Sequence, residues 1–151
     1  MQEGSGEIDT DSINTVAIDI VNRMGVIDEA TCLELITSTP IGRVGFMSDG
    51  APLVLPVNFA WHEGAVVFRT LEGVKMAAAA EGQAVCFEVD QWDAQTKTGW
   101  SVVVRGQAAE VTGWAEIEQL ENIGLTPWSR EKWRRLWVKI VPTEISGRVL
   151  R

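Results

Sequence analysis

The chain has 151 residues, a hydrophobic content of 46% and a formal net charge of −8 at pH 7. This length fits a single domain with one sizeable core, and the composition is typical of a folded globular protein. The negative charge opposes the long-range attraction that nucleic acid or an anionic membrane surface requires, so neither is expected as a partner.

The sequence shows no sign of membrane insertion or export. No apolar run approaches the roughly 20 residues that span a bilayer. The first residues, MQEGSGEIDT, are acidic, whereas a secretory leader begins with basic residues and continues with an apolar stretch. Cys32 and Cys86 share no CxxC spacing, and His62 has no second histidine or cysteine near it to complete a metal site. We therefore expect a cytoplasmic protein with no metal centre, in which both thiols act as small hydrophobes.

The N-terminal part divides into a tail and a helix. Residues 1–11 are interpreted as an acidic flexible tail. Residues 12–27 are predicted to form an amphipathic helix, because their apolar residues recur at intervals of three and four. Ser12 is placed to cap one end of this helix and Gly25 the other. The rest of the chain, residues 28–151, is taken as the main domain.

The main domain begins with a short helix and continues with strands. The helix is expected in DEATCLELIT, where Asp28 can cap the N-terminus and Thr39-Pro40 ends the element. From residue 41 the pattern changes to that of strands. The segments IGRVGFMS, APLVLPVNFA and AVVFRT are separated by Asp49-Gly50 and by WHEG, both of which are hairpin signals, so they are predicted to form an antiparallel meander.

Further elements follow in the second half of the chain. Strands are expected in QAVCFEVD, WSVVVRGQAAEV and LWVKIVP, and AEIEQLENIG is interpreted as a helix that stops at Gly124. Parallel βαβ units would need a helix after every strand. The six strands therefore predict a mainly β (α+β) fold, an antiparallel barrel with peripheral helices.

One strand end carries an unusual group of residues. A strand that leads into a helix N-terminus offers free backbone N–H groups and the positive end of the helix dipole, which favour a phosphate. Here Arg69 can donate in a fork, Thr70 can donate a hydroxyl hydrogen bond, Gly73 permits close approach, and Lys75 adds a charge. This pattern predicts a phosphate cradle, although Glu72 opposes it unless its carboxylate points away. From these residues alone, solvated charges at a strand end remain an equal alternative.

Several motifs, in order, resemble those of the pyridoxamine 5'-phosphate oxidase-like family of flavin-binding split barrels, over roughly residues 25–150. The motifs are IGRVGFMSDGAPLVLPVNFAWHEGAVVFRTLEGVKM, VCFEVDQWD, GWSVVVRGQAAEV, PW and ISGR. The resemblance is strongest to the branch of small flavoproteins. It implies a six-stranded antiparallel split β-barrel over residues 28–151, and a homodimer that holds FMN in the cleft between its two chains.

The resemblance also implies which positions contact the flavin ring. Pro56, Val57 and Asn58 would pass along the ring with backbone groups facing its polar edge. Trp100 and Ser101 begin the strand that would reach the ring from the other subunit.

The phosphate of FMN would be held at the strand end described above. Arg69 and Thr70 match the family's phosphate-binding step, and Lys75 matches a basic position just inside the following helix. The resemblance thus favours the cradle over solvated charges.

The chain departs from the family at the substrate site. The oxidase that gives the family its name holds pyridoxamine phosphate with a basic residue on the second strand and an Arg/His pair near its C-terminus. This chain has Asn58 and ISGRVL at the comparable places. The prediction is therefore an FMN-dependent oxidoreductase that transfers electrons between the flavin and a small organic substrate other than pyridoxamine phosphate.

The sequence leaves other functions open. No residue stands out as a catalytic acid or base, so the catalytic residues are unknown. The alternatives are a non-catalytic flavin carrier or sensor, a deazaflavin- or haem-binding relative, and a structural dimer that has lost its cofactor. Deazaflavin is disfavoured, because its polyglutamate tail should favour a basic groove and the chain is acidic.

Overall fold

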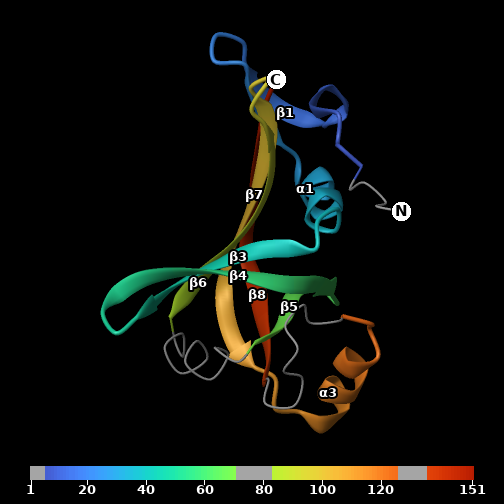
Figure 1. Cartoon of the computed structure of the whole chain (residues 1–151), viewed down its shortest axis with the longest axis vertical. Coiled ribbons are helices and arrows are strands. Elements are labelled where there is room, and N and C mark those ends of the chain that lie inside the picture. The colour runs from blue at the N-terminus through green and yellow to red at the C-terminus, as the bar shows by residue number, and fades with distance from the viewer. Residues whose placement is uncertain (1–5, 71–82, 126–135) are drawn as a thin grey trace.

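The computed structural model describes residues 6–70, 83–125 and 136–151. In chain order its elements are a 3₁₀ turn (Thr10–Ser12), β1 (Thr15–Asp19), β2 (Met24–Ile27), α1 (Glu29–Ile36), β3 (Ile41–Ser48), β4 (Ala51–His62), β5 (Ala65–Thr70), β6 (Ala84–Asp93), β7 (Thr98–Glu110), α3 (Trp114–Glu121) and β8 (Leu136–Leu150). Figure 1 shows the long strands β7 and β8 running through the length of the molecule, with α1 beside the upper half and α3 at the lower end.

The strands β8, β5, β4, β3, β6 and β7 form a closed ring in that order, because β7 also pairs with β8. All of these pairings are antiparallel. Alternate residues of each strand point into the ring, where they form the main core around Val44, Phe59, Phe68, Phe87, Val102 and Val138. The predicted six-stranded antiparallel barrel with peripheral helices is therefore confirmed.

The two predicted hairpin turns of the meander are also confirmed. Asp49 and Gly50 have φ angles of 51° and 79°, and Glu63 and Gly64 have φ angles of 48° and 77°. Positive φ at both central residues is the signature of a two-residue type I′ turn, whose twist matches that of the flanking strands. Glycine at the second position takes this conformation without steric cost.

The predicted amphipathic helix over residues 12–27 is wrong. The segment forms an antiparallel hairpin in which β1 pairs with β2, and β2 pairs in turn with β8. The apolar residues of the expected helical stripe do not share a buried face, because Val16 and Ile20 are 69% and 85% exposed. The N-terminal segment is therefore an extension of the sheet.

Local turn chemistry explains this hairpin. The carboxylate of Asp19 accepts hydrogen bonds from the backbone N–H of Asn22 at 3.1 Å and from its side-chain amide at 2.7 Å. These bonds close the turn and hold the pKa of Asp19 below its usual value. Arg23 follows with a φ of 57°, which no helix interior contains. The β-branched residues Thr15, Val16 and Ile18 further favour a strand over a helix.

The part of the predicted acidic tail that the structure describes is held against the sheet. The backbone N–H of Ile8 donates to Oε1 of Gln91 at 3.3 Å, and the Ile8 side chain packs against the core. Within the described residues no helix is long and apolar enough to cross a bilayer.

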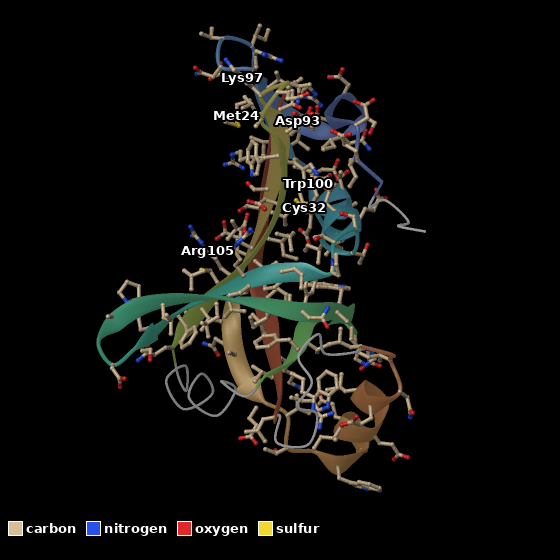
Figure 2. The ribbon with its side chains drawn as sticks, in the orientation of Figure 1. Met24, Cys32, Asp93, Lys97, Trp100 and Arg105 are labelled. Atoms are coloured by element: carbon tan, nitrogen blue, oxygen red, sulfur yellow. The ribbon has the colours of Figure 1, made fainter. Side chains whose placement is uncertain are left out.

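Helix α1 begins where the sequence predicts. Oδ1 of Asp28 accepts from the backbone N–H of Thr31 at 2.8 Å, and Oδ2 accepts from the Thr31 hydroxyl at 3.0 Å. The helix buries Cys32, Leu35 and Ile36. Trp100 of β7 and Cys32 of α1 both belong to the core, and the helix lies alongside β7 (Figure 2).

Helix α3 covers a different part of the sheet. Its Leu120 packs with Val67 of β5, with Trp137 of β8, and with Val111 just after β7, as a second small core. This packing holds the end of α3 over the outer face of β5 and β8 (Figure 1). It brings Glu121, the last residue of the helix, to the end of β5.

Candidate functional site

The residues predicted to pass along the flavin ring lie in the middle of β4. Val57 points into the core and is buried, so it can offer a ligand only its backbone. Pro56 and Asn58 alternate with it and point to the outer face of the ring. On that face Pro56 lies opposite Arg43 of β3, and Asn58 lies opposite Ile41.

Asn58 has an unused hydrogen-bond acceptor. Its Nδ2 donates to the carbonyl oxygen of Pro40 at 3.0 Å, and the backbone N–H of Phe59 donates to the same oxygen at 3.3 Å. This contact fixes the orientation of the amide. Oδ1 of Asn58 is buried and accepts no hydrogen bond from the described residues. A buried acceptor without a donor is costly, so this atom marks a place where a ligand donor would stabilise the protein.

Arg69 lies beside Asn58 on the same face. Phe59 of β4 and Phe68 of β5 form the last pair between these strands, and continuing their antiparallel register by one position sets Arg69 next to Asn58. On its other side Arg69 pairs with Trp137 of β8. The structure thus brings together two of the residues that the sequence predicts for the site, one from each of two neighbouring strands.

The guanidinium of Arg69 is engaged by two groups that the sequence analysis missed. Its Nη1 lies 2.9 Å from Oε1 and 3.1 Å from Oε2 of Glu121. Its Cζ lies 5.5 Å from the ring centroid of Trp137, whose Nε1 donates to Oε1 of Glu121 at 3.1 Å. We call Arg69, Glu121 and Trp137 the arginine cluster. Because Glu121 is 52 positions from Arg69 in the chain, no local sequence signal could have revealed it.

The remaining phosphate-binding predictions are only partly covered by the structure. Thr70 ends β5, with its backbone opposite Leu136. The side chain of Thr70 and the whole of Lys75 lie outside the described residues, as do Glu72 and Gly73. Their predicted roles therefore stay predictions.

Trp100 and Ser101 face opposite sides of β7. The Trp100 side chain is 1% exposed and packed in the core, and its Nε1 has no partner among the described residues. Its ring therefore presents no surface to a cofactor in this structure. Ser101 is half-buried on the outer face, opposite Asp90 of β6 and Arg148 of β8. Of this pair, only the Ser101 side chain is placed to meet a ligand.

Within one chain Ser101 lies far from Arg69. Ser101 pairs with Arg148, whereas Arg69 pairs with Trp137, and both partners belong to β8. At about 3.3 Å per residue, positions 137 and 148 are roughly 36 Å apart along this strand. The two halves of the predicted site therefore do not meet in a single chain.

A cluster of charged side chains lies on the outer face beside Ser101. Nη1 of Arg43 lies 3.2 Å from Oε2 of Glu88 and 3.1 Å from Oδ1 of Asp90, and Nε1 of Trp92 donates to Oδ2 of Asp90 at 3.1 Å. Partial burial, followed by repulsion from Asp90, raises the pKa of Glu88, although Arg43 opposes the shift. The charged groups of this cluster are paired with one another. The cluster is therefore best explained as a surface ion-pair network rather than as an acid–base pair.

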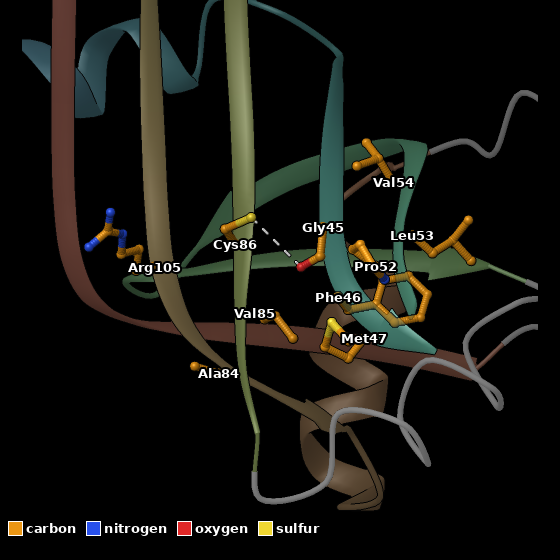
Figure 3. Close-up of a pocket in the computed structure, with 10 residues that line it drawn as sticks. All are labelled: Gly45, Phe46, Met47, Pro52, Leu53, Val54, Ala84, Val85, Cys86 and Arg105. Carbon is orange, nitrogen blue, oxygen red and sulfur yellow. Dashed lines mark hydrogen bonds between the residues drawn. The ribbon is translucent and has the colours of Figure 1, made fainter. Parts of the chain in front are cut away.

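An apolar groove of about 420 Å³ opens on the sheet between the β3–β4 hairpin, β6 and β7. Figure 3 shows Met47, Leu53 and Val54 on one side, Cys86 and Ala84 on the other, and Arg105 at the edge. Met47, Leu53 and Val54 are all exposed. Among the described parts of the chain, none of the predicted site residues lines this groove.

A second cavity of similar volume lies between the end of α1 and β4. Its walls include Thr39, Pro40, Phe59 and Trp61. It is adjacent to the predicted site, because Pro40 is the residue whose carbonyl oxygen Asn58 contacts.

The chain is similar to one protein family and to solved proteins of the same fold. Residues 28–149 match the family model described as pyridoxamine 5'-phosphate oxidase. A solved protein from Corynebacterium glutamicum, provisionally assigned as a pyridoxamine 5'-phosphate oxidase, is 33% identical with a TM-score of 0.73, over 83% of this chain and 97% of its own. The FAD-binding protein of Mycobacterium smegmatis is 35% identical with a TM-score of 0.69, over 83% and 99%.

A curated relative supports the same assignment. The uncharacterized protein Rv0080 of Mycobacterium tuberculosis is 34% identical over 107 residues, which cover 68% of this chain and 70% of the relative. Because the family model covers most of the chain and the ring of strands is that of the solved relatives, the chain belongs to the pyridoxamine 5'-phosphate oxidase-like family of flavin-binding split barrels.

Proposed function

We propose that this protein is a flavin-dependent oxidoreductase that binds FMN with the help of Arg69. The observation that carries the proposal is the placement of Arg69 beside Asn58 on the outer face of the ring, in a family that binds flavins. The relative from Mycobacterium smegmatis is described as binding FAD, which supports a flavin as the cofactor class.

The residues present fit a phosphorylated flavin. A guanidinium donates in a planar fork that suits a phosphate, and Arg69 retains 22% exposure of its side chain. The buried Oδ1 of Asn58 needs a donor, and a flavin ring carries one N–H group that can supply it. The flavin supplies the electron transfer when it is bound. The chain would hold the phosphate at Arg69 and orient the polar edge of the ring at Asn58.

The proposed functional unit is a homodimer. Ser101 is too far along the sheet to complete the site of its own chain, whereas a second copy seated on the outer face could supply it. The apolar groove lies on that face and gives it surface to bury. A two-fold arrangement would place the same residues at both sites.

The proposed substrate is a small organic molecule other than pyridoxamine phosphate. Asn58 stands where the oxidase of that name has a basic residue, and Arg69, the cation of β5 nearest to it in register, is assigned to the cofactor. Reduced nicotinamide, tested with a quinone or nitro compound as acceptor, distinguishes an enzyme from a flavin carrier. An enzyme gives repeated turnover, whereas a carrier gives at most one reduction per bound flavin.

The phosphate assignment is tested by removing its cations. Arg69→Ala and Lys75→Ala should each weaken FMN binding by about 1.5–3 kcal/mol, the scale of a charge-assisted hydrogen bond. Riboflavin, which lacks the phosphate, should bind weakly and respond little to either change. Quenching of flavin fluorescence at fixed ionic strength measures both ligands. An equal loss of affinity for FMN and riboflavin would mean that the substitutions damage the pocket in general. Unchanged FMN affinity would mean that both residues are solvated charges and do not bind the phosphate.

A further inference from the structure

Glu121 occupies the position from which it can control what Arg69 binds. Both of its carboxylate oxygens lie within 3.1 Å of Nη1 of Arg69. The indole N–H of Trp137 donates to the same carboxylate, so Glu121 is held from two elements, β5 and β8, while it belongs to a third. A carboxylate fixed at this distance already offsets much of the charge that Arg69 would present to an anion.

The other described charges nearby do not offset Glu121. Lys139 of β8 is paired with Glu116 of α3 at 2.8 Å, so this lysine is neutralised by its own partner. Glu118 lies on the same helix and is exposed. An anion bound at Arg69 would therefore feel a repulsion from Glu121 that the neighbouring pair does not cancel.

This repulsion depends on the charge that the ligand carries. A phosphate monoester such as that of FMN carries about −1.5 to −2 at pH 7. Each of the two phosphates of a dinucleotide such as FAD has one ester bond and one anhydride bond, so each carries a single negative charge. Riboflavin has no phosphate. A fixed carboxylate beside the binding cation should therefore weaken the binding of FMN most, weaken that of FAD less, and leave that of riboflavin unchanged.

We propose that Glu121 is a charge filter that sets the preference of this site between a terminal phosphate, which carries close to two negative charges on one group, and an internal phosphate of a dinucleotide, which carries one. The proposal rests on the proposed function, because it needs Arg69 to be the phosphate ligand. Glu121 lowers the affinity for FMN more than for FAD and leaves riboflavin unaffected. It acts through Arg69 and is a specificity-determining residue rather than a catalytic one.

The test is Glu121→Gln, measured with FMN, FAD and riboflavin by quenching of flavin fluorescence. Glutamine keeps a side-chain oxygen that can accept the hydrogen bond from Trp137, so the substitution removes the charge and preserves the shape. The FMN dissociation constant should fall about three- to fivefold, the range of a partly exposed charge interaction. The FAD constant should fall by less, and the riboflavin constant should not change.

Glu118→Gln is the matched control, since it removes the same charge from the exposed side of the same helix. It should leave all three affinities unchanged. FMN affinity that is unchanged or weaker in Glu121→Gln overturns the charge filter, as does an equal gain for all three ligands or an equal gain in Glu118→Gln. If the unchanged protein binds none of the three flavins, the proposed function itself is overturned and the filter with it.

Discussion

The two cysteines lie in contrasting surroundings. Cys32 is fully buried in α1, and its Sγ lies 4.0 Å from the carbonyl oxygen of Ile27. Burial, followed by the nearby charges of Asp28 and Glu29, raises the pKa of this thiol to about 11. Cys86 is exposed at the edge of the apolar groove, so of the two thiols only that of Cys32 is buried.

This difference predicts how the thiols react. At pH 8 Cys32 is both covered and protonated, and only a thiolate attacks a disulfide reagent. A Cys86→Ser variant should therefore show no reactive thiol in the native state and one after denaturation. A rapidly reacting thiol in the native variant would contradict the burial of Cys32.

The raised pKa of Cys32 also makes the stability of the folded protein depend on pH. The folded protein prefers the protonated thiol, so the contribution of this group to stability is fully present below pH 9 and is lost as the pH rises towards about 11. A Cys32→Ala variant should lose less stability than the unchanged protein across this alkaline range.

At the scale of the elements, α1 depends on its cap. Asp28 accepts two hydrogen bonds from Thr31 and satisfies one of the free N–H groups of the first turn. Asp28→Ala should lower the free energy of unfolding by about 1 kcal/mol, the usual cost of losing such a cap. Denaturant unfolding measures the change. Glu29→Ala is the control, because the Glu29 side chain makes no hydrogen bond with the residues that the structure describes. A loss as large as that of Asp28→Ala would assign the effect to charge near the helix end.

The elements that the sequence predicts well are those with local signals. The Asp49-Gly50 and WHEG turns each carry a glycine that takes positive φ without steric cost, and the cap of α1 lies three residues from its partner. The segment over residues 12–27 was misassigned because its apolar spacing fits a helix, whereas the turn bonds of Asp19 and the pairing of β2 with β8 favour a hairpin. Pairing with a distant strand leaves no mark within the segment itself.

The same distinction applies to the candidate site. Asn58 and Arg69 could be named because they lie in motifs whose order resembles a family, and the register then places them side by side. Glu121 and Trp137 reach Arg69 only because α3 packs on β5 and β8. Trp100 could not be oriented in advance, because a shift of one position along a strand exchanges the core face for the outer face.

At the scale of the whole molecule, the apolar groove offers a test of the proposed dimer. Cys86 lines the groove, so a second copy seated there should protect its thiol from a disulfide reagent. The reaction of Cys86 should be slow at concentrations where sedimentation shows a dimer, and should become fast on dilution to monomer. Added salt should favour the dimer, because the net charge of −8 on each chain opposes association. A stable monomer that still holds one flavin per chain would contradict the dimer.

Every role proposed for this protein depends on whether the chain binds a flavin. The most direct measurement is the visible absorption spectrum of the purified protein, taken before and after addition of FMN or FAD and removal of the unbound ligand. We expect flavin bands that stay with the protein at about one flavin per chain. A protein that retains neither flavin, or that shows the Soret band of haem without flavin bands, would contradict this expectation.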